Sequence, residues 1–437
     1  MAQQPFAGFF FCKARSTTLQ TRMPEMTTVA TKPTSPALKI GVIAFGAVLL
    51  LSFYQLTIEN SYAPLRPEIA VDLHLNTLQT ALISSSFLIA YALVQIPAGF
   101  LIDRIGTARI LPFVAIATGL GAFFMSKSDG MTGAVAGRSL MGIAAAFGCP
   151  AAASVARRAI PLMYFPLCMG LTDMAIGLGG VSGTWGGNEL QAMTHWRTTL
   201  QIAAVAALPL SLILFFAIRN RWFGSYYKPT VEFEPKLSVV GTIKDLWARR
   251  NVRIASLIFA GGCGTICGFG GMWNMQLAES WAWKEPQAIL IASSLYVGLA
   301  IGSPLTGSLG VRFGSRATIL TCMSITLPAF LFWLLVPIDW PLWFDAFNVA
   351  VIGAGLSSVT LAFEIAGRSL PSGRVATAIA MVNLAGIFAG AVLEIIPGIV
   401  THFLNASPLH EMQIANAVFA VMLVVTIWAT TLVRKAE

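Results

Sequence analysis

Long apolar runs spaced along nearly the whole chain are the feature that most constrains its fold. A helix needs about 20 apolar residues to cross the hydrocarbon layer of a bilayer, which is roughly 30 Å thick. Runs of this kind lie near residues 38–58, 78–98, 110–126, 132–156, 161–185, 198–218, 253–277, 286–306, 317–336, 342–364, 374–398 and 412–433. The sequence therefore predicts an all-α polytopic membrane protein with twelve transmembrane helices, and the short third run leaves eleven as the alternative.

The composition excludes most soluble classes of protein. Hydrophobic residues make up 56% of the chain and charged residues 11%, whereas a soluble domain carries about 25% charged residues. The net charge of +9 raises the question of nucleic acid. A nucleic-acid binder clusters its basic residues on one folded face, but here they interrupt the apolar runs at regular intervals. We therefore expect a lipid bilayer as the partner and no nucleic acid.

The six cysteines indicate neither a disulfide scaffold nor a metal site. Cys12 lies in the N-terminal tail, and the other five lie in apolar runs where an exterior disulfide would not form. Cys263 and Cys267 share a helix face at i, i+4, but packing of two small residues against a neighbouring helix explains that spacing better than metal binding. We expect no metal and no cofactor.

The placement of lysine and arginine predicts the orientation, because these residues accumulate in cytoplasmic loops. If both termini are cytoplasmic, 23 of the 28 basic residues fall in cytoplasmic segments and Arg138 falls within a span. The outer loops then keep only Arg66, Lys127, Arg197 and Lys284. We expect cytoplasmic N- and C-termini and, from the short outer loops, a bacterial inner membrane.

The apolar pattern divides the chain into four segments. Residues 1–37 are polar and lack the features of a cleavable signal peptide, so we expect a disordered cytoplasmic tail. Residues 38–218 and residues 253–434 each hold six predicted spans and form the two bundles. Residues 219–252 carry mixed charges and two X-Pro steps, which favours a cytoplasmic linker.

The two sets of spans carry an internal repeat. At a constant offset of 208, residues 79–106 and 287–314 match at ten of 28 positions. Shared hydrophobicity explains the matched leucines and alanines, but not two glycines and an arginine in register at a helix–loop junction. Parallel repeats with a central pathway at their interface are a transporter architecture. The predicted fold is therefore two like-oriented six-helix repeats.

The junction resembles the loop signature of the major facilitator superfamily. Residues 99–109 read Gly-Phe-Leu-Ile-Asp-Arg-Ile-Gly-Thr-Ala-Arg, and the copy over residues 307–316 reads Gly-Ser-Leu-Gly-Val-Arg-Phe-Gly-Ser-Arg. The copy fits less well because Val311 replaces the acid. Arg138-Ser-Leu-Met-Gly142 and Trp196-Arg197 are also similar to family features. The resemblance covers essentially the whole chain after the tail and implies the family's fold of two six-helix bundles.

The resemblance also implies a cytoplasmic latch that holds the halves together while the pathway faces outward. Glycines permit the sharp turn, and Asp103 can favour the positive N-terminal end of a facing helix near Ser372. Glu364 is a candidate partner of Arg312 or Arg316. The latch residues are Gly99, Asp103, Arg104, Gly106, Arg109, Gly307, Arg312, Gly314, Arg316 and Glu364. The alternative is that these arginines only anchor helices at the membrane interface.

Asp173 is the leading candidate for the functional site, because an ionisable residue inside the bilayer is costly. It lies about twelve residues into the fifth predicted span, roughly 18 Å by helical rise and close to the midplane. An offset of 210 places Asn383 opposite it in the eleventh span. Asp173 is a candidate substrate ligand or proton carrier, since burial favours the neutral carboxyl group. The alternative is a structural acid paired with Arg138.

Further polar residues are candidates to line a cavity. Arg138, near the outer end of the fourth span, either binds an anionic group or attracts Asp173, or else it reaches the outer headgroups. Glu59 ends the first predicted span, and like Glu394 in the eleventh it is explained equally well as a solvated edge. The remaining candidates, which serve equally as interface anchors or interhelical hydrogen-bonding residues, are Tyr54, Gln55, Tyr91, Gln95 and Trp273.

Two other features bear on function. The four histidines (His74, His195, His402 and His410) fall in predicted outer loops, where unrelated loop residues are a better explanation than a pH sensor or metal site. The glycine-rich run 177–187 partly resembles a fifth-span motif of the superfamily's antiporters, but Thr184 stands where that motif has proline. This departure favours import over drug export.

Together these inferences predict a monomeric secondary active transporter for a small polar or zwitterionic metabolite. Its halves would rock to give alternating access. No Gly-x-x-x-x-Gly-Lys-Ser/Thr sequence occurs, so an ion gradient is the expected energy source, most simply protons through Asp173. Symport is the first expectation, and an antiporter of the same fold or a receptor that binds solute without moving it are the alternatives. An intramembrane enzyme is disfavoured because no His-Glu-x-x-His sequence occurs.

Overall fold

The computed structural model describes residues 35–161, 164–218, 239–336, 340–368, 370, 372–404 and 407–434. Within these ranges every regular element is a helix. Residues 1–34 of the predicted tail and most of the predicted linker lie outside the described residues, and residues 35–37 already belong to the first helix. The described part of the linker forms the helix α10 (Val239–Ala248) and the start of α11.

The first half of the chain forms six helical segments. Four are single helices (α1, α2, α3 and α8), one is the pair α4 and α5, and one is interrupted by a π-helical turn. The segment with the π-turn contains α6, η2 and α7. The elements are α1 (Ser35–Asp72), α2 (Thr77–Ile105), α3 (Thr107–Ser126), α4 (Met131–Ala145), α5 (Gly148–Ala159), α6 (Phe165–Val181), η2 (Ser182–Gly186), α7 (Gly187–Met193) and α8 (Trp196–Ile218).

The second half repeats this organisation, with a π-turn (η3) after its first helix and a 3-10 turn (η4) in its fourth segment. The elements are α11 (Arg250–Gly268), η3 (Phe269–Trp273), α12 (Asn274–Ser280), α13 (Glu285–Phe313), α14 (Ser315–Leu335), α15 (Leu342–Leu356), η4 (Ser357–Leu361), α16 (Ala362–Gly367), α17 (Ser372–Phe403) and α18 (Pro408–Thr431).

Eleven helical segments of the described chain are long and apolar enough to cross a membrane. The continuous helical run from Phe165 to Met193 lies between the fourth of these segments and α8. It occupies the place of the predicted fifth span. The all-α polytopic membrane fold is therefore confirmed, and the exact count of twelve stays a prediction.

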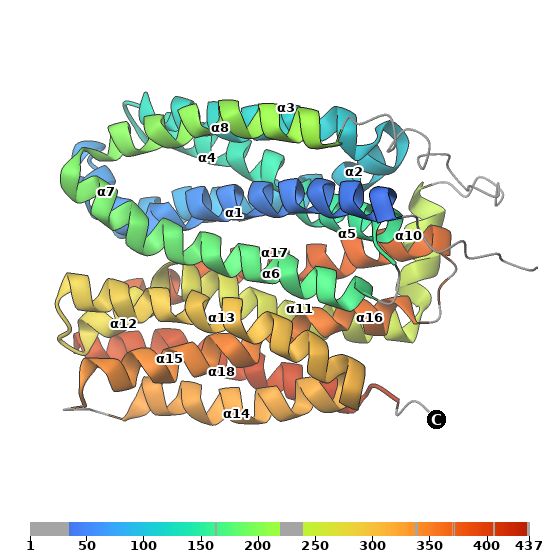
Figure 1. Ribbon diagram of the computed structural model, residues 1–437. Helices are drawn as coiled ribbons and strands as arrows, with labels where there is room; N and C mark the ends of the chain where they lie inside the picture. Colours follow the sequence, from blue (N-terminus) through green and yellow to red (C-terminus); the bar gives the residue numbers. More distant parts are fainter. Residues whose placement is uncertain are drawn as a thin grey trace, which may run out of the picture.

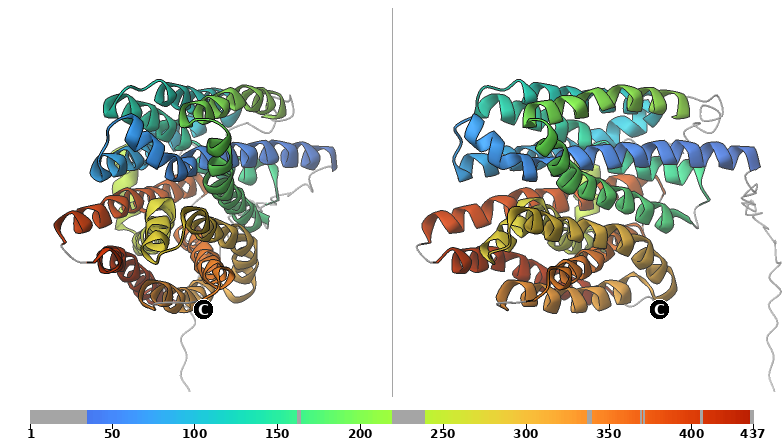
Figure 2. Two further views of the ribbon diagram at one scale, coloured as in Figure 1. Left: turned by 90° about the vertical axis from the view of Figure 1, so that its left-hand side faces the viewer. Right: turned by 60° about the vertical axis from the view of Figure 1, so that its left-hand side comes forward.

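The helices pack as two bundles, one from each half of the chain (Figure 1). Turned views show the same two bundles stacked on each other (Figure 2). The seam between them is formed mainly by α2 against α17 and by α6 against α13. In the repeat, α2 corresponds to α13 and α6 to α17, so the two contacts of the seam are equivalent to each other.

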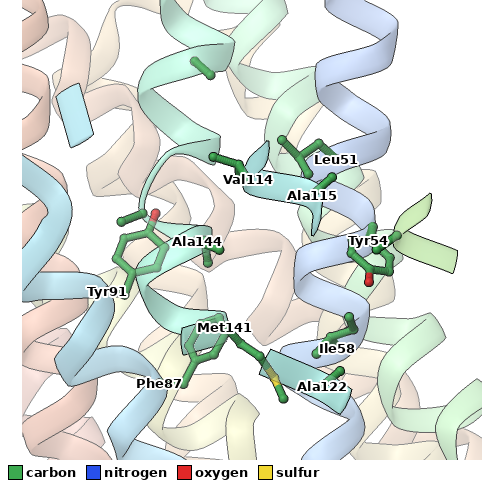
Figure 3. Close-up of a cluster of buried hydrophobic side chains, with 14 of the residues drawn as sticks. Leu51, Tyr54, Ile58, Phe87, Tyr91, Val114, Ala115, Ala122, Met141 and Ala144 are labelled. Carbon is green, nitrogen blue, oxygen red and sulfur yellow. The ribbon is translucent and has the colours of Figure 1, made fainter. Parts of the chain in front are cut away.

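Each bundle has its own apolar core. In the first bundle, buried side chains of α1, α2, α3 and α4 include Leu51, Ile58, Phe87, Val114 and Met141 (Figure 3), and α5, α6 and α8 contribute further ones. In the second bundle the rings of Phe269, Phe330 and Phe419 contact one another across three segments. Because most of this packing lies within one half, each bundle is held together largely without the seam.

The two repeats make the same turn at their glycine junctions. Gly106 between α2 and α3 has φ 93°, and Gly314 between α13 and α14 has φ 83°. A side chain strains this backbone conformation, which explains why glycine recurs at the matched position. In both turns the glycine N–H donates to the carbonyl four residues earlier, at 3.0 Å. Both junctions lie at the same end of the molecule, near α10 and the C-terminus (Figure 1).

We call this end the linker side and the opposite end, where α1 meets α2, the distal side. α1 extends to Asp72 on the distal side, well beyond the predicted end of the first span near residue 58. That predicted boundary was wrong because it followed hydrophobicity alone. Beyond it, Leu65 and Ile69 remain buried. Glu59 consequently lies well inside a helix rather than at its end.

Polar contacts hold the distal end of α1 to α8. Glu68 Oε1 pairs with His195 at 2.9 Å, and Asp72 Oδ2 accepts from Trp196 Nε1 at 3.0 Å. Arg197 pairs with Asp72 at 2.9 Å and also donates to the carbonyls that end α3. The Trp-Arg feature thus fastens the first bundle together at its distal rim.

Candidate functional site

A charged cluster lies in the seam, in its distal half. Arg138 of α4 lies seven residues from the distal end of its span, or about 10 Å by helical rise. Glu59 comes from α1 of the same half, and Glu394 comes from α17 of the other half. Arg138 and Glu394 are each 3% exposed. The three groups lie close enough to interact electrostatically.

Arg138 is held mainly by backbone and rings. Its Nη1 and Nη2 both donate to the Glu59 carbonyl at 3.2 Å, and Nη1 also donates to the Ile58 carbonyl at 3.4 Å. The guanidinium lies 4.8 Å from the ring centre of Tyr62 and 5.1 Å from that of Phe87. These contacts fix its position without a direct ion pair among the described side chains. Arg138 therefore does not snorkel to the headgroups.

Glu394 links the two halves. Ser84 Oγ of α2 donates to its Oε1 at 2.6 Å, whereas Oε2 has no hydrogen-bond partner in the described part of the chain. The Glu394 carbonyl accepts from Trp273 Nε1 at 2.8 Å, which ties α17 to η3. A buried carboxyl oxygen without a partner is costly. It marks the position where a proton or another cation would be stabilising.

A small cavity of about 10 Å³ lies between these groups. This volume holds roughly one water-sized particle. Its lining combines both halves of the molecule and consists of Glu59, Asn60, Tyr62, Ser84, Leu88, Arg138, Cys267, Gly271 and Glu394. The sequence-predicted Glu59 and Arg138 are thus brought together, along with Glu394.

Two further hydrogen bonds join the halves at this depth. Tyr296 Oη of α13 donates to Asn60 Oδ1 of α1. The hydroxyl groups of Thr184 and Ser293 are 2.8 Å apart, which joins η2 to α13. Together with the bond between Ser84 and Glu394, they close the distal half of the seam in this structure.

Asp173 lies in a second polar region, nearer the linker side. It is eight residues from the start of α6 at Phe165, or about 12 Å by helical rise, and so lies below the predicted midplane position. The side chain is 8% exposed. Thr360 of η4, in the other half, lies close enough to interact with the carboxyl group, while its hydroxyl group donates to the Ser357 carbonyl at 2.9 Å. Asp173 Oδ2 has no partner among the described atoms. The Cys149 thiol is also near enough to interact with it.

The predicted pairing of Asp173 with Arg138 is wrong in this structure. Arg138 contacts α1 in the distal half, whereas Asp173 faces Thr360 in the linker-side half. The reason is that the two residues lie at different depths, Arg138 about 10 Å from the distal start of α4 and Asp173 about 12 Å from the linker-side start of α6. The two residues therefore belong to different polar regions.

The other predicted lining residues fall into two groups. Asn383 Nδ2 donates to Tyr91 Oη at 3.4 Å across the seam between α17 and α2. Gln95, one turn farther along α2, is fully buried, and neither its Oε1 nor its Nε2 has a partner in the described chain. These residues supply polar groups in the middle of the seam.

Tyr54 and Gln55 instead join helices within the first bundle. Tyr54 Oη donates to the Ala203 carbonyl at 2.7 Å, and Gln55 Nε2 donates to the Ala144 carbonyl at 3.1 Å. Trp273 is fully buried and contributes its bond to the Glu394 carbonyl. These contacts favour a packing role for Tyr54 and Gln55.

The predicted latch residues lie at the linker side. The side chains of Asp103 and Arg104 lie outside the described residues, and Arg109 is exposed. Arg312 lies over the ring of Phe313 at 5.2 Å, and Arg316 donates to the Thr431 carbonyl at 3.4 Å. An added side-chain carbon at Gly99 would lie 3.8 Å from Ala380 of α17, so this glycine is in contact range of the other half.

Glu364 has different partners from those expected. It pairs with Arg368 at 3.1 Å and accepts a hydrogen bond from Ser315 at the start of α14. Arg368 lies four residues later in the chain, and an i, i+4 pair forms more readily than a pair between helices. The predicted pairing with Arg312 or Arg316 is therefore not found in this structure.

Several residues of the distal region carried little sequence signal. Asn60 lies just beyond the predicted first span, Ser84 is one of three consecutive serines, and Tyr296 is one aromatic residue within an apolar run, so nothing singles them out. Glu394 carried a signal, because a carboxyl group inside a span is a functional candidate in itself. Cys267 was interpreted only as a packing residue, and the structure places it at the cavity. No group of three or more His, Cys, Asp or Glu side chains able to hold a metal ion occurs among the described residues.

Known proteins share this arrangement. The family model described as Major Facilitator Superfamily matches residues 47–276, which is more than half of the chain. The nitrite extrusion protein of Bacillus subtilis (strain 168) is 23% identical over 195 residues, covering 44% of this chain and 46% of that protein. This chain thus aligns with less than half the length of that curated relative.

Two solved structures of a bacterial homologue of the human lysosomal transporter Spinster have a similar fold, both inward-facing. The occupied form has a TM-score of 0.66 at 16% identity, covering 89% of this chain and 96% of that one. The unoccupied form has a TM-score of 0.65 at 18% identity, covering 92% and 97%. With the family match and the apolar helices, this likeness identifies an integral membrane transporter, and the chain belongs to the Major Facilitator Superfamily.

Proposed function

We propose that this transporter is a secondary active carrier that couples the movement of a small polar solute to a proton gradient. The halves rock about the seam, so that the pathway opens alternately to the distal side and to the linker side. Glu59 and Arg138 form the coupling pair, and the Asp173 region binds the solute. This assignment moves the coupling role from Asp173 to the distal cluster.

The observation that carries the proposal is the charged cluster at the seam. One buried carboxyl group, one partly buried carboxyl group and one buried guanidinium inside a membrane protein are costly to fold. They come from both halves, so a rocking motion would change their separation. A role in the transport cycle explains why such a costly arrangement lies at the moving interface.

The polar groups of the seam favour a solute that carries a positive charge, such as an amine or a zwitterion. Glu59, Asp173 and Glu394 are acids, whereas Arg138 is the one base among the described charged residues that contribute to the two polar regions. Arg138 already donates to backbone carbonyls. Its Nε has no partner among the described atoms, but a small anion such as nitrite, named for the Bacillus subtilis relative, would meet three acids and only this one base here.

The direction and orientation belong to the same proposal. The excess of lysine and arginine at the linker side supports a cytoplasmic location for that side, and the short outer loops support a bacterial inner membrane. Thr184 contacts Ser293 at the position where the antiporter motif has proline. This supports uptake by symport over export. The linker-side latch belongs to the distal-open state, which this structure does not adopt.

Reconstitution into liposomes tests the proposal. The purified protein would be given an imposed pH gradient and a panel of radiolabelled small amines, zwitterions and inorganic anions including nitrite. We expect accumulation of a cationic or zwitterionic solute that collapses when a protonophore is added. A receptor without transport activity would bind a solute in a thermal-shift screen but give no flux. Accumulation of nitrite alone would contradict the proposed substrate class.

A further inference from the structure

We infer that closing the distal side captures one monovalent cation, a proton or a sodium ion, between Glu59, Arg138 and Glu394. This inference rests on the proposed alternating-access function and adds a stoichiometry to it. A captured proton is bound to a carboxyl oxygen at the small cavity of the seam, whereas a captured sodium ion occupies the cavity itself. Its release accompanies separation of the halves on that side.

The charges contributed by each half differ, and this difference carries the inference. The first half contributes Glu59 and Arg138, whose charges cancel. The second half contributes Glu394. When the distal side closes, Glu394 adds one negative charge without a counter-charge to the cavity that Glu59 and Arg138 also line. A buried charge without a counter-charge is strongly unfavourable. One added positive charge restores neutrality.

Other titratable groups around the cavity do not alter this balance. Thiols and phenols are neutral near pH 7. Those that interact with the cluster are Tyr62 of α1, Tyr91 of α2, Cys267 of α11 and Tyr296 of α13, and Cys263 of α11 interacts with Cys267 and Tyr91. Arg66 lies nearer the rim, where it interacts with both Tyr62 and Glu279. The carboxyl group of Glu279 offsets its charge.

The geometry of the cavity fits a single small cation. Its volume of about 10 Å³ leaves room for roughly one water-sized particle. Glu394 Oε2 is buried without a partner in the described chain, and the other oxygen, Oε1, already accepts from Ser84. Gly271 of η3 faces the same carboxyl group, and a side-chain carbon there would lie 3.2 Å from Oε1. The open coordination position is therefore Oε2.

The test measures how cations control the separation of the halves. Spin-labelled unnatural amino acids would replace Asp129 and Lys284, which are exposed at the distal side, one in each half. Distances between them would be recorded in liposomes across a pH series in choline buffer, and across a sodium series at fixed alkaline pH. Capture of one cation predicts that the closed-to-open ratio falls about tenfold for each unit by which the pH is raised. It should likewise fall about tenfold for each tenfold decrease in sodium concentration.

Variants separate the cluster from general effects. Glu394→Gln should close without dependence on pH or sodium, whereas Glu285→Gln, at an exposed carboxyl group of α13, should behave like the unmodified protein. Ser84→Ala retains the charge of Glu394, so it should keep the tenfold slope with a smaller closed fraction. The inference is overturned if Glu394→Gln keeps the slope, or if the unmodified protein responds to neither cation. Solute flux by the same samples reports separately on the proposed function.

Discussion

Two polar regions lie along the seam, and they differ in how their charges are balanced. In the distal region, Glu59, Arg138 and Glu394 share one cavity and come from both halves. In the linker-side region, Asp173 faces a hydroxyl group and a thiol, Thr360 and Cys149. The distal region can redistribute charge when the halves move. In the proposed function, the substrate supplies the positive charge that balances the linker-side acid.

Removing the guanidinium group of Arg138 should have the largest effect on transport and stability among the substitutions that compare the two polar regions. Arg138→Ala leaves the distal carboxyl groups without a counter-charge, which costs about 3–5 kcal/mol when a buried pair is broken. We expect lost flux in liposomes and a lower unfolding temperature in detergent. Lys284→Ala, exposed at the distal side, is the control and should change stability by less than about 0.5 kcal/mol. Full flux by Arg138→Ala would show that the cluster is dispensable.

Neutralising the linker-side acid should weaken solute binding while leaving coupling intact. Asp173→Asn removes a charge-assisted hydrogen bond worth about 1.5–3 kcal/mol, so the solute KM should rise roughly ten- to hundredfold. The ratio of accumulation to imposed pH gradient, measured at saturating solute, should stay unchanged. Asp129→Asn, in an exposed loop, is the matched control. Loss of gradient-driven accumulation with an unchanged KM would restore Asp173 to the coupling role.

Neutralising the distal acid of the first half should have the reverse effect. One pH unit is worth about 1.4 kcal/mol per proton and supports about tenfold accumulation at one proton per solute. Glu59→Gln should lose this accumulation while counterflow exchange of labelled solute continues. The exposed Glu285→Gln variant should accumulate normally. If Glu59→Gln accumulates solute normally, the proton does not travel through this cluster.

A single hydrogen bond across the seam should have the smallest effect. Tyr296→Phe removes the bond to Asn60, a loss of about 1 kcal/mol, which should shift the closed-to-open ratio about fivefold towards open. Spin-label distances at the distal side would measure the shift. Tyr54→Phe removes a bond within the first bundle and should leave the ratio unchanged. Equal shifts in the two variants would indicate general destabilisation.

The internal repeat can be predicted from the sequence more easily than the candidate site. The matched glycines at 106 and 314 both adopt a positive φ, a conformation that favours glycine, so the residue type itself indicates the turn. Asp173 and Arg138 were recognisable because charge inside an apolar run is costly. Their partners were not, because hydropathy gives depth along a helix but neither the direction of a side chain nor the helix it faces.

The uncertain ends of the spans were the main obstacle to predicting the site from the sequence. Hydropathy placed Glu59 at the end of a helix because polar residues and prolines follow it, yet α1 continues to Asp72. Contacts with α8 hold that extension in place, and they depend on residues more than a hundred positions away. From the sequence alone, Glu59 and Glu394 are therefore explained equally well as solvated residues at the ends of spans. Only the packing of both halves shows that they lie at the seam.

The most direct test of the rocking seam is a reversible crosslink at its distal half. Thr184→Cys with Ser293→Cys places two thiols at side chains whose oxygen atoms are 2.8 Å apart across the halves. Thr194→Cys with Thr199→Cys, 3.1 Å apart within the first half, is the matched control. Oxidation should stop solute flux in the first variant, reduction should restore it, and the control should transport throughout. Undiminished flux through the crosslinked seam would contradict alternating access by rocking of the two halves.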